Sequence, residues 1–148
     1  MNTQRQYLKA IYLIQEAEDG PASTGDIADT VGVSPASANE MIGKLQDGGL
    51  ADHEKYKGVS LTDEGIKQAR EALETYCIIE RFLVEVLDVG EGEFRAEAKQ
   101  LESVIDETVA DRLDTIIDRS EQCPDCFDAD ADVCSLLEAE LTASEPAD

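Results

Sequence analysis

Apolar residues recur at helical spacing in the first third of the chain. They predict a helix over residues 3–17, carried by Tyr7, Leu8, Ile11, Tyr12 and Ile14. A second helix is predicted over 25–31, ended by Gly32, and Ser34 caps a third that runs to about residue 47. Two helices joined by a tight turn that contains Gly are typical of a helix-turn-helix.

The residues after this pair predict a β-hairpin and a longer helix. Residues 50–54 and 58–62 have the composition of two short strands. Thr62 is a suitable N-cap for a helix that starts at Asp63 and continues past Tyr76. A hairpin placed after a helix-turn-helix is the order of elements in a winged helix.

Helical periodicity then continues to about residue 116, with one interruption at 89–92. Short apolar helices need a partner surface, so we expect this region to form a dimer. The predicted fold is mainly α, an N-terminal winged helix-turn-helix followed by a helical dimerisation domain. Its expected parts are a DNA-binding domain over 1–73, a dimerisation domain over 74–118 and a Cys-containing acidic tail over 119–148.

The net charge of −22 is unexpected for a nucleic-acid-binding chain, but its distribution matters. Residues 1–70 carry seven Lys and Arg against eleven Asp and Glu, and residues 71–148 carry five against 23. The repulsive charge therefore lies mostly outside the predicted winged helix. Acidic residues spread along the whole chain also favour a halophilic, haloarchaeal protein over an ordinary acidic one, and in molar salt the Debye length of about 3 Å would screen this charge.

Several classes of protein are not expected. There is no run of about twenty apolar residues and no secretory signal pattern, so we expect a cytoplasmic protein without a membrane partner. The sequence lacks a nucleophile–base–acid set and a phosphate-binding Gly loop, so we expect no enzyme. The single histidine, His53, lies on the first predicted strand and is interpreted as a surface or packing residue.

The second helix of the pair predicts a DNA reader. Side chains in its N-terminal half would meet base edges in the major groove, namely Pro35, Ala36, Ser37, Asn39 and Glu40. Asn39 could pair with a base, Ala36 or Ala38 could pack on a thymine methyl, and Ser34, Ser37 and Lys44 could contact phosphates. The hairpin tip, with Lys55, Tyr56 and Lys57, could grip the backbone or the minor groove. Taken singly, these residues could also be only a helix start and a turn.

The chain resembles the DtxR/MntR family of metal-dependent repressors over residues 3–117. The resemblance is carried by residues 7–12, 25–28, 33–37, 54–62 and 80–83, together with Glu97-Ala98 and Leu101-Glu102. It implies a homodimer on a palindromic, double-stranded DNA operator near metal-homeostasis genes. In the family, Mn(II) or Fe(II) promotes DNA binding.

The family's metal ligands are poorly kept. Glu80 and Glu102 remain, but the other ligand positions fall at Gln6, Lys9, Tyr76, Arg95, Lys99 and Ser103. Mn(II) and Fe(II) need several oxygen or imidazole ligands, and two cations in the pocket would repel them. We therefore expect the usual site to be lost or rebuilt, with Glu80 and Glu102 as ion-pair partners or as secondary metal ligands.

Cysteines offer another metal site. Cys123 and Cys126 form a C-x-x-C, Cys134 follows, and Cys77 is a candidate fourth ligand. Four thiolates suit zinc, iron or an iron–sulfur cluster. Alternatively, the three tail cysteines form a purely structural zinc site, and Cys77 is only a core residue.

Three functions follow from these patterns. The first is a dimeric DNA-binding transcription regulator of iron or manganese homeostasis, or of a redox response, controlled through the cysteines. The second is an Mn(II)- or Fe(II)-activated repressor with a rebuilt site at Glu80 and Glu102. The third is a metal-binding adaptor that contacts protein and never DNA.

Overall fold

The computed structural model describes residues 2–54, 56–90, 93–117, 125, 127–128 and 133–134, and for residues 2, 3, 133 and 134 the backbone only. The chain forms two compact units, Met1–Ala72 and Leu73–Asp148, here called the first and the second unit. None of the helices in the described part is long and apolar enough to cross a membrane.

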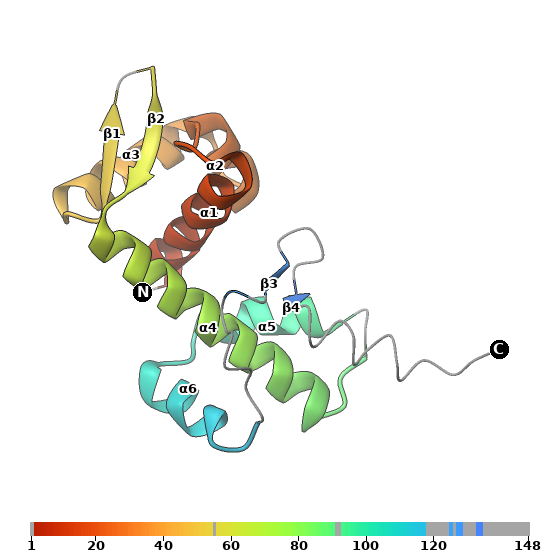
Figure 1. Ribbon diagram of the computed structural model, residues 1–148. Helices are drawn as coiled ribbons and strands as arrows, with labels where there is room; N and C mark the ends of the chain where they lie inside the picture. Colours follow the sequence, from red (N-terminus) through yellow and green to blue (C-terminus); the bar gives the residue numbers. More distant parts are fainter. Residues whose placement is uncertain are drawn as a thin grey trace. The chain divides into compact units, whose positions relative to one another are not determined.

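The first unit is a winged helix (Figure 1). Helices α1 (Asn2–Glu18), α2 (Thr24–Val31) and α3 (Pro35–Asp47) precede an antiparallel hairpin of β1 (Ala51–Glu54) and β2 (Gly58–Leu61). Helix α4 (Asp63–Glu85) then begins in this unit and continues into the second. The helical periods, caps and turn signals of the sequence predicted each of these elements to within one or two residues at most ends. The extent of α4 was left open.

Side-chain caps and a glycine fix the ends of helices in the first unit. The hydroxyl of Ser23 accepts a hydrogen bond from the Asp26 amide at 3.0 Å, and Gly32 ends α2 with a left-handed φ of 84°. Thr62 has the same role at α4, where its Oγ1 accepts from the Gly65 amide at 3.1 Å. Each cap satisfies a backbone group that the helix itself leaves unpaired, so the polar residues in the turns set where the helices begin.

An apolar core joins all elements of the first unit. It includes Tyr7, Leu8 and Ile11 of α1, Ile27 and Ala28 of α2, Ala38, Ile42 and Leu45 of α3, and Val59 and Leu61 of β2. Two side-chain hydrogen bonds also attach α1 to β2 and to α4. The Gln15 side chain accepts a hydrogen bond from the Leu61 amide at 3.1 Å, and Arg70 donates to the Tyr12 hydroxyl at 2.8 Å.

The second unit contains the remainder of α4, α5 (Phe94–Glu102) and α6 (Glu107–Asp114), followed by a short antiparallel pair of β3 (Phe127–Asp128) and β4 (Val133–Cys134). Its core is built on Tyr76, Cys77, Ile79, Leu83, Phe94 and Ala98. The β3–β4 pair was not predicted, because two-residue strands in an acidic segment give no periodic signal.

Candidate DNA interface and regulatory centre

Helix α3 presents a polar face because its apolar face is fixed in the core. Ala38, Ile42 and Leu45 are fully buried, and this sets the rotation of the helix about its axis. Along the outer face lie the predicted base-reading residues Pro35, Ala36, Ser37, Asn39 and Glu40, all of them exposed. Ala38 itself is 0% exposed, so the expectation that it could pack on a thymine methyl is wrong, and for Ala36 this contact stays a prediction.

The start of α3 is held by its own side chains. Ser34 Oγ accepts a hydrogen bond from the Ser37 amide at 3.2 Å and donates to the Ser37 hydroxyl at 3.0 Å. Pro35 occupies the first turn, where a missing N–H leaves no bond unmade. The residues predicted to meet base edges therefore stand on a rigid, capped helix end.

Charge on this face is balanced locally. Lys44 lies 4.0 Å from Glu40, and both side chains are largely exposed, so the pair contributes little to stability. The pKa of Tyr7 is raised, first by the burial of this residue and second by the negative charge of Glu40. Tyr7 therefore stays a neutral core residue at any pH near neutrality.

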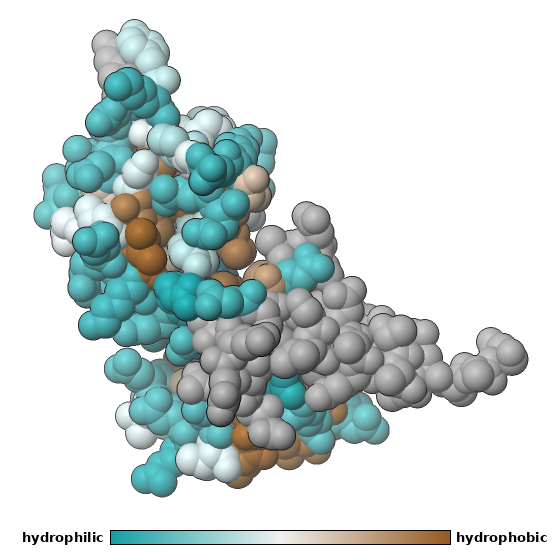
Figure 2. All heavy atoms as spheres, viewed as in Figure 1, coloured by the Kyte–Doolittle hydropathy of each residue, from teal (hydrophilic) through white to brown (hydrophobic). Residues whose placement is uncertain are grey.

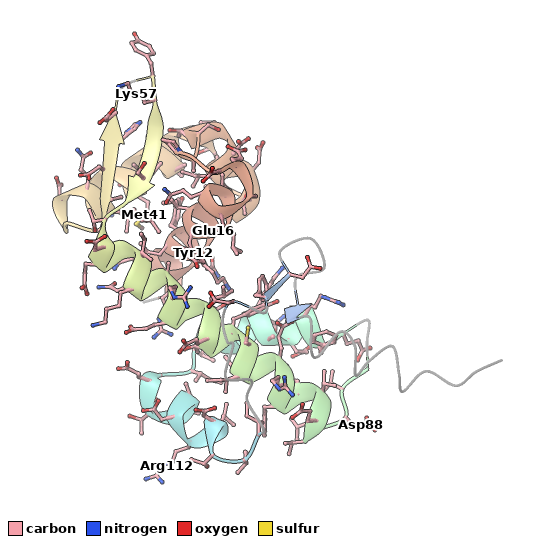
Figure 3. All side chains as sticks on the ribbon, viewed as in Figure 1. Tyr12, Glu16, Met41, Lys57, Asp88 and Arg112 are labelled. Atoms are coloured by element: carbon pink, nitrogen blue, oxygen red, sulfur yellow. The ribbon has the colours of Figure 1, made fainter. Side chains whose placement is uncertain are left out.

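The wing projects from the helices, with Lys57 at its tip (Figures 1 and 3). Tyr56 is 94% exposed and has a left-handed φ of 70°. The Lys57 ammonium lies 3.5 Å from Glu54, again as an exposed pair. Lys55, the third residue of the predicted wing tip, lies outside the described residues. An exposed aromatic ring beside a lysine suits contact with a DNA groove and backbone.

The second unit has charged residues inside its core. Glu80 is 0%, Glu102 3% and Arg81 5% exposed, and Arg81 donates to Glu85 at 2.6 Å. Buried charges must be compensated by partners inside the protein, as Arg81 is by Glu85.

The positions of the family's other ligands do not supply a manganese or iron site in the described part of the chain. Tyr76 is buried, Arg95 holds its guanidinium 4.6 Å from the centre of the Phe94 ring, and Lys99 is exposed. Within the same part there is no group of three or more His, Cys, Asp or Glu that could hold a metal ion. Glu80 and Glu102 are two buried carboxylates in this part of the chain, and two carboxylates alone are fewer ligands than Mn(II) or Fe(II) needs.

The predicted cysteine ligands are only partly within the described residues. Cys77 is 1% exposed, in the core of the second unit, and Cys134 belongs to β4, where only its backbone is described. Cys123 and Cys126 lie outside. The ring of Phe127 packs edge-on against Tyr76 at 6.1 Å between centroids, and Phe127 pairs with Cys134 in the β3–β4 register. Phe127, the residue directly after the C-x-x-C, therefore packs against the core cluster to which Cys77 also belongs.

Comparisons with known proteins agree with both units. Residues 1–59 match the iron dependent repressor N-terminal DNA binding domain, and residues 62–127 match the metal binding and dimerisation domain of the same repressors. An uncharacterized HTH-type transcriptional regulator of Methanocaldococcus jannaschii is 31% identical over 113 residues, which cover 76% of this chain and 90% of the relative. The regulator MntR of Listeria welshimeri is 29% identical, with 83% and 85% covered.

Among solved structures, the manganese regulator SloR superposes with a TM-score of 0.69 at 30% identity. The match covers 84% of this chain but 57% of the SloR chain, so the chain spans little more than half the length of that relative. The relatives with functional names are transcriptional regulators and not enzymes. The chain belongs to the DtxR/MntR family of metal-dependent transcriptional regulators, with the family's DNA-binding and dimerisation domains.

Proposed function

We propose that the chain is a homodimeric transcription regulator that binds a palindromic operator of metal-homeostasis or redox-response genes through α3 and the wing. Its DNA binding is controlled by zinc, iron or an iron–sulfur cluster held by Cys123, Cys126, Cys134 and Cys77. The observation that supports this proposal is the packing of Phe127 against Tyr76, in the core cluster to which Cys77 also belongs.

The steps of the DNA-binding part follow from exposure and charge. Ser34, Ser37 and Lys44 would contact phosphates, and Pro35, Ala36, Asn39 and Glu40 would meet base edges. Lys55, Tyr56 and Lys57 would hold the backbone or the minor groove. Lys44, Lys55 and Lys57 would place positive charge at the DNA although the net charge of the chain is −22, and molar salt in a haloarchaeal cell would screen the repulsion.

The cysteine part replaces what the family's ligand positions no longer provide. Thiolates are soft ligands that select zinc and iron–sulfur clusters over Mn(II). Three of the four cysteines fall within twelve residues near the end of the chain, and the fourth is one residue from Tyr76, the family's histidine position. A metal bound there would tie this segment to α4, the helix that continues from the DNA-binding unit.

A second candidate keeps the family's metal. Glu80 and Glu102 are buried carboxylates in the same unit, and with backbone or water ligands they could form a weak Mn(II) or Fe(II) site. This candidate predicts metal binding that survives loss of the tail cysteines and is lost in Glu80→Gln.

Metal content tests the cysteine site. Protein purified without oxygen should contain stoichiometric zinc or iron by elemental analysis, and a cluster would give visible absorption. The double variant Cys123→Ser, Cys126→Ser should lose it, while Glu80→Gln should keep it. Equal metal content in wild type and the double variant contradicts the cysteine site.

DNA binding is tested separately. Duplexes selected from a random library in high KCl should converge on a palindrome, and their affinity should differ between metal-loaded and metal-free protein. A library that shows no enrichment with any metal or redox state would support the third function, a metal-binding adaptor that contacts protein only.

A further inference from the structure

Gly43 lies in the interior of α3, where glycine lowers the stability of a helix. The helix runs from Pro35 to Asp47, so Gly43 is more than one turn from either end. Glycine loses more conformational freedom on folding than any other residue, and only proline is less favourable inside a helix. A glycine at this position therefore calls for a compensating role.

Packing and backbone conformation do not account for Gly43, although they account for other glycines of the first unit. A Cβ at Gly58 would lie 2.6 Å from the carbonyl oxygen of Ala22. A Cβ at Gly65 would lie 2.0 Å from the carbonyl oxygen of Leu50. At Gly43 a Cβ would meet nothing within 4 Å among the described residues, and the backbone there is helical and not left-handed. The fold of the first unit would thus accept a larger residue at this position.

Gly43 shares a helix face with the predicted base-reading residues. It follows Ala36, Asn39 and Glu40 by seven, four and three residues, which is the spacing of one face of a helix. The opposite face of α3 is fixed in the core by its buried residues. Position 43 therefore adjoins four exposed side chains on the surface of α3, those of Asn39, Glu40, Gln46 and Asp47. Gly43 is a gap among them.

A side chain in this gap would cover the base-reading turn. In a helix the Cα–Cβ bond tilts toward the N-terminus, so each residue covers the surface over the turn that precedes its own Cα. A side chain at position 43 would accordingly lie over the turn that carries Asn39 and Glu40. Because the residue is glycine, this turn is left uncovered on its C-terminal side.

The major groove of DNA leaves little room for an added side chain. It is about 12 Å wide and about 8.5 Å deep, and a helix with its side chains is about 10–12 Å across. A larger residue on the face toward the bases would hold the helix further out, and a hydrogen bond to a base edge is lost at a separation of about 3.6 Å. A gap beside Asn39 therefore suits a helix that lies in this groove.

We propose that Gly43 is a specificity-determining residue of the DNA reader. The missing side chain lets α3 lie close enough to the base edges for Asn39 to contact one. The proposal rests on the proposed function of α3, and it adds a residue that makes no polar contact of its own. The lower helix stability at Gly43 is then offset by closer contact with DNA.

The first test compares fold stability with DNA affinity in Gly43→Ala and Gly43→Leu. Alanine and leucine are better helix formers than glycine, so the melting temperature should rise by about 2–4 °C. Affinity for a duplex that wild type selects should fall instead, about threefold with alanine and about tenfold or more with leucine, as for a misread base pair. Affinity for a scrambled duplex, and its salt slope, should stay those of wild type because no charge changes.

Gln4→Leu is the matched control. It places the same leucine at an exposed position of α1, outside α3 and the wing, and it also leaves the charge unchanged. It should bind the selected duplex as wild type does. Gly43→Ala decides the question if Gly43→Leu does not fold, since its effects on stability and on affinity are expected to have opposite signs.

Three results would overturn the proposal: wild-type affinity for the selected duplex in the folded Gly43 variants, an equal loss in Gln4→Leu, or an equal loss on selected and scrambled duplexes. The last would mean that the leucine hinders the approach of any DNA and does not act on base reading. A wild type that selects no duplex would instead contradict the proposed function of α3, so the two failures are distinct.

A double-mutant cycle tests whether Gly43 acts through Asn39. Residues that act together have non-additive effects, so in an Asn39→Ala background Gly43→Leu should weaken binding by less than about twofold. The full loss in that background would overturn the role assigned to the gap. Sedimentation of Gly43→Leu should give the assembly of wild type. A loss of assembly that accounts for the lower affinity would make Gly43 part of a protein interface and would also overturn the proposal.

Discussion

The two units differ in what they bury and what they expose. In the described part of the chain, every buried polar or charged residue lies in the second unit, namely Thr75, Glu80, Arg81 and Glu102. The exposed large apolar residues show the same bias: Val86, Leu87, Val104, Val109 and Ile116 belong to the second unit, and only Tyr56 and Ile66 to the first. Figure 2 shows apolar atoms gathered at the lower edge of the second unit.

The two units therefore differ in where their candidate functional residues lie. The first unit has a wholly apolar core, and its candidate contacts with DNA are surface residues on capped elements. The second unit has charged residues in its core and large apolar side chains on its surface, and the latter are expected where a partner copy covers a domain. Surface substitutions in the first unit should therefore change DNA binding without changing the stability of the fold. Substitutions in the second unit should change stability and function together.

The largest expected effect comes from emptying one core at a time. Phe94→Ala removes a side chain that is 0% exposed in the second unit and should lower the free energy of unfolding by about 4 kcal/mol. Ile11→Ala is its counterpart in the first unit, at about 3 kcal/mol. Amide signals in NMR should be lost from the affected unit only. If each variant unfolds both units together, the two cores form one cooperative structure and the comparison fails.

A close backbone contact should have the next largest effect. A Cβ at Gly65 would lie 2.0 Å from the Leu50 carbonyl oxygen, so Gly65→Ala must push the start of α4 away from Leu50, the residue before β1. We expect a loss of about 2–3 kcal/mol, the usual cost of overpacking, measured by thermal denaturation. Gly43→Ala is the control with the opposite sign. Its Cβ meets nothing within 4 Å in the middle of α3, so the variant should gain up to about 1 kcal/mol.

These residues also show how far sequence reasoning reaches. The start of a helix can be predicted from its N-cap residue, since a cap acts within three residues of its own position, as it does at Ser23, Ser34 and Thr62. The contact of Gly65 with Leu50, and that of Phe127 with Tyr76, depend on distant segments meeting in space. The local sequence contains no signal for such contacts, so the winged helix was predictable and the contact of Phe127 with Tyr76 was not.

The exposed apolar residues of the second unit provide the next test. Val104 is 77% exposed, and we expect Val104→Asp to weaken the dimer about 30-fold, because burying an unpaired charge at an interface costs about 2 kcal/mol. Sedimentation measures the assembly. Ile66→Asp places the same charge on an exposed apolar position of the first unit and should leave the dimer intact. Dissociation by both variants would remove the asymmetry between the units.

A smaller loss is expected at the start of α3. Ser34→Ala deletes the oxygen that accepts from the Ser37 amide and should cost about 1 kcal/mol of stability. Ser34→Gly should cost only roughly 0.3 kcal/mol of stability, since glycine is itself tolerated at an N-cap. Both variants remove the hydroxyl, so a phosphate contact by Ser34 predicts that they lose DNA affinity equally. Affinity that follows stability instead would show that Ser34 acts only as a cap.

Of these variants, Lys44→Gln should change stability least, and it should separate stability from DNA affinity most clearly. The side chain is exposed, its partner Glu40 is 4.0 Å away, and pairs of this kind on a helix contribute about 0.3 kcal/mol. The melting temperature should therefore hardly move. If Lys44 contacts a phosphate, its removal lowers the salt slope of DNA binding by about 0.9 and weakens binding to all sequences alike. Glu40→Gln provides the opposite arm: it removes the same ion pair but leaves the positive charge of Lys44 in place, so the salt slope should stay that of wild type. Equal loss of affinity in both variants would show that the ion pair positions α3 and that neither charge meets DNA.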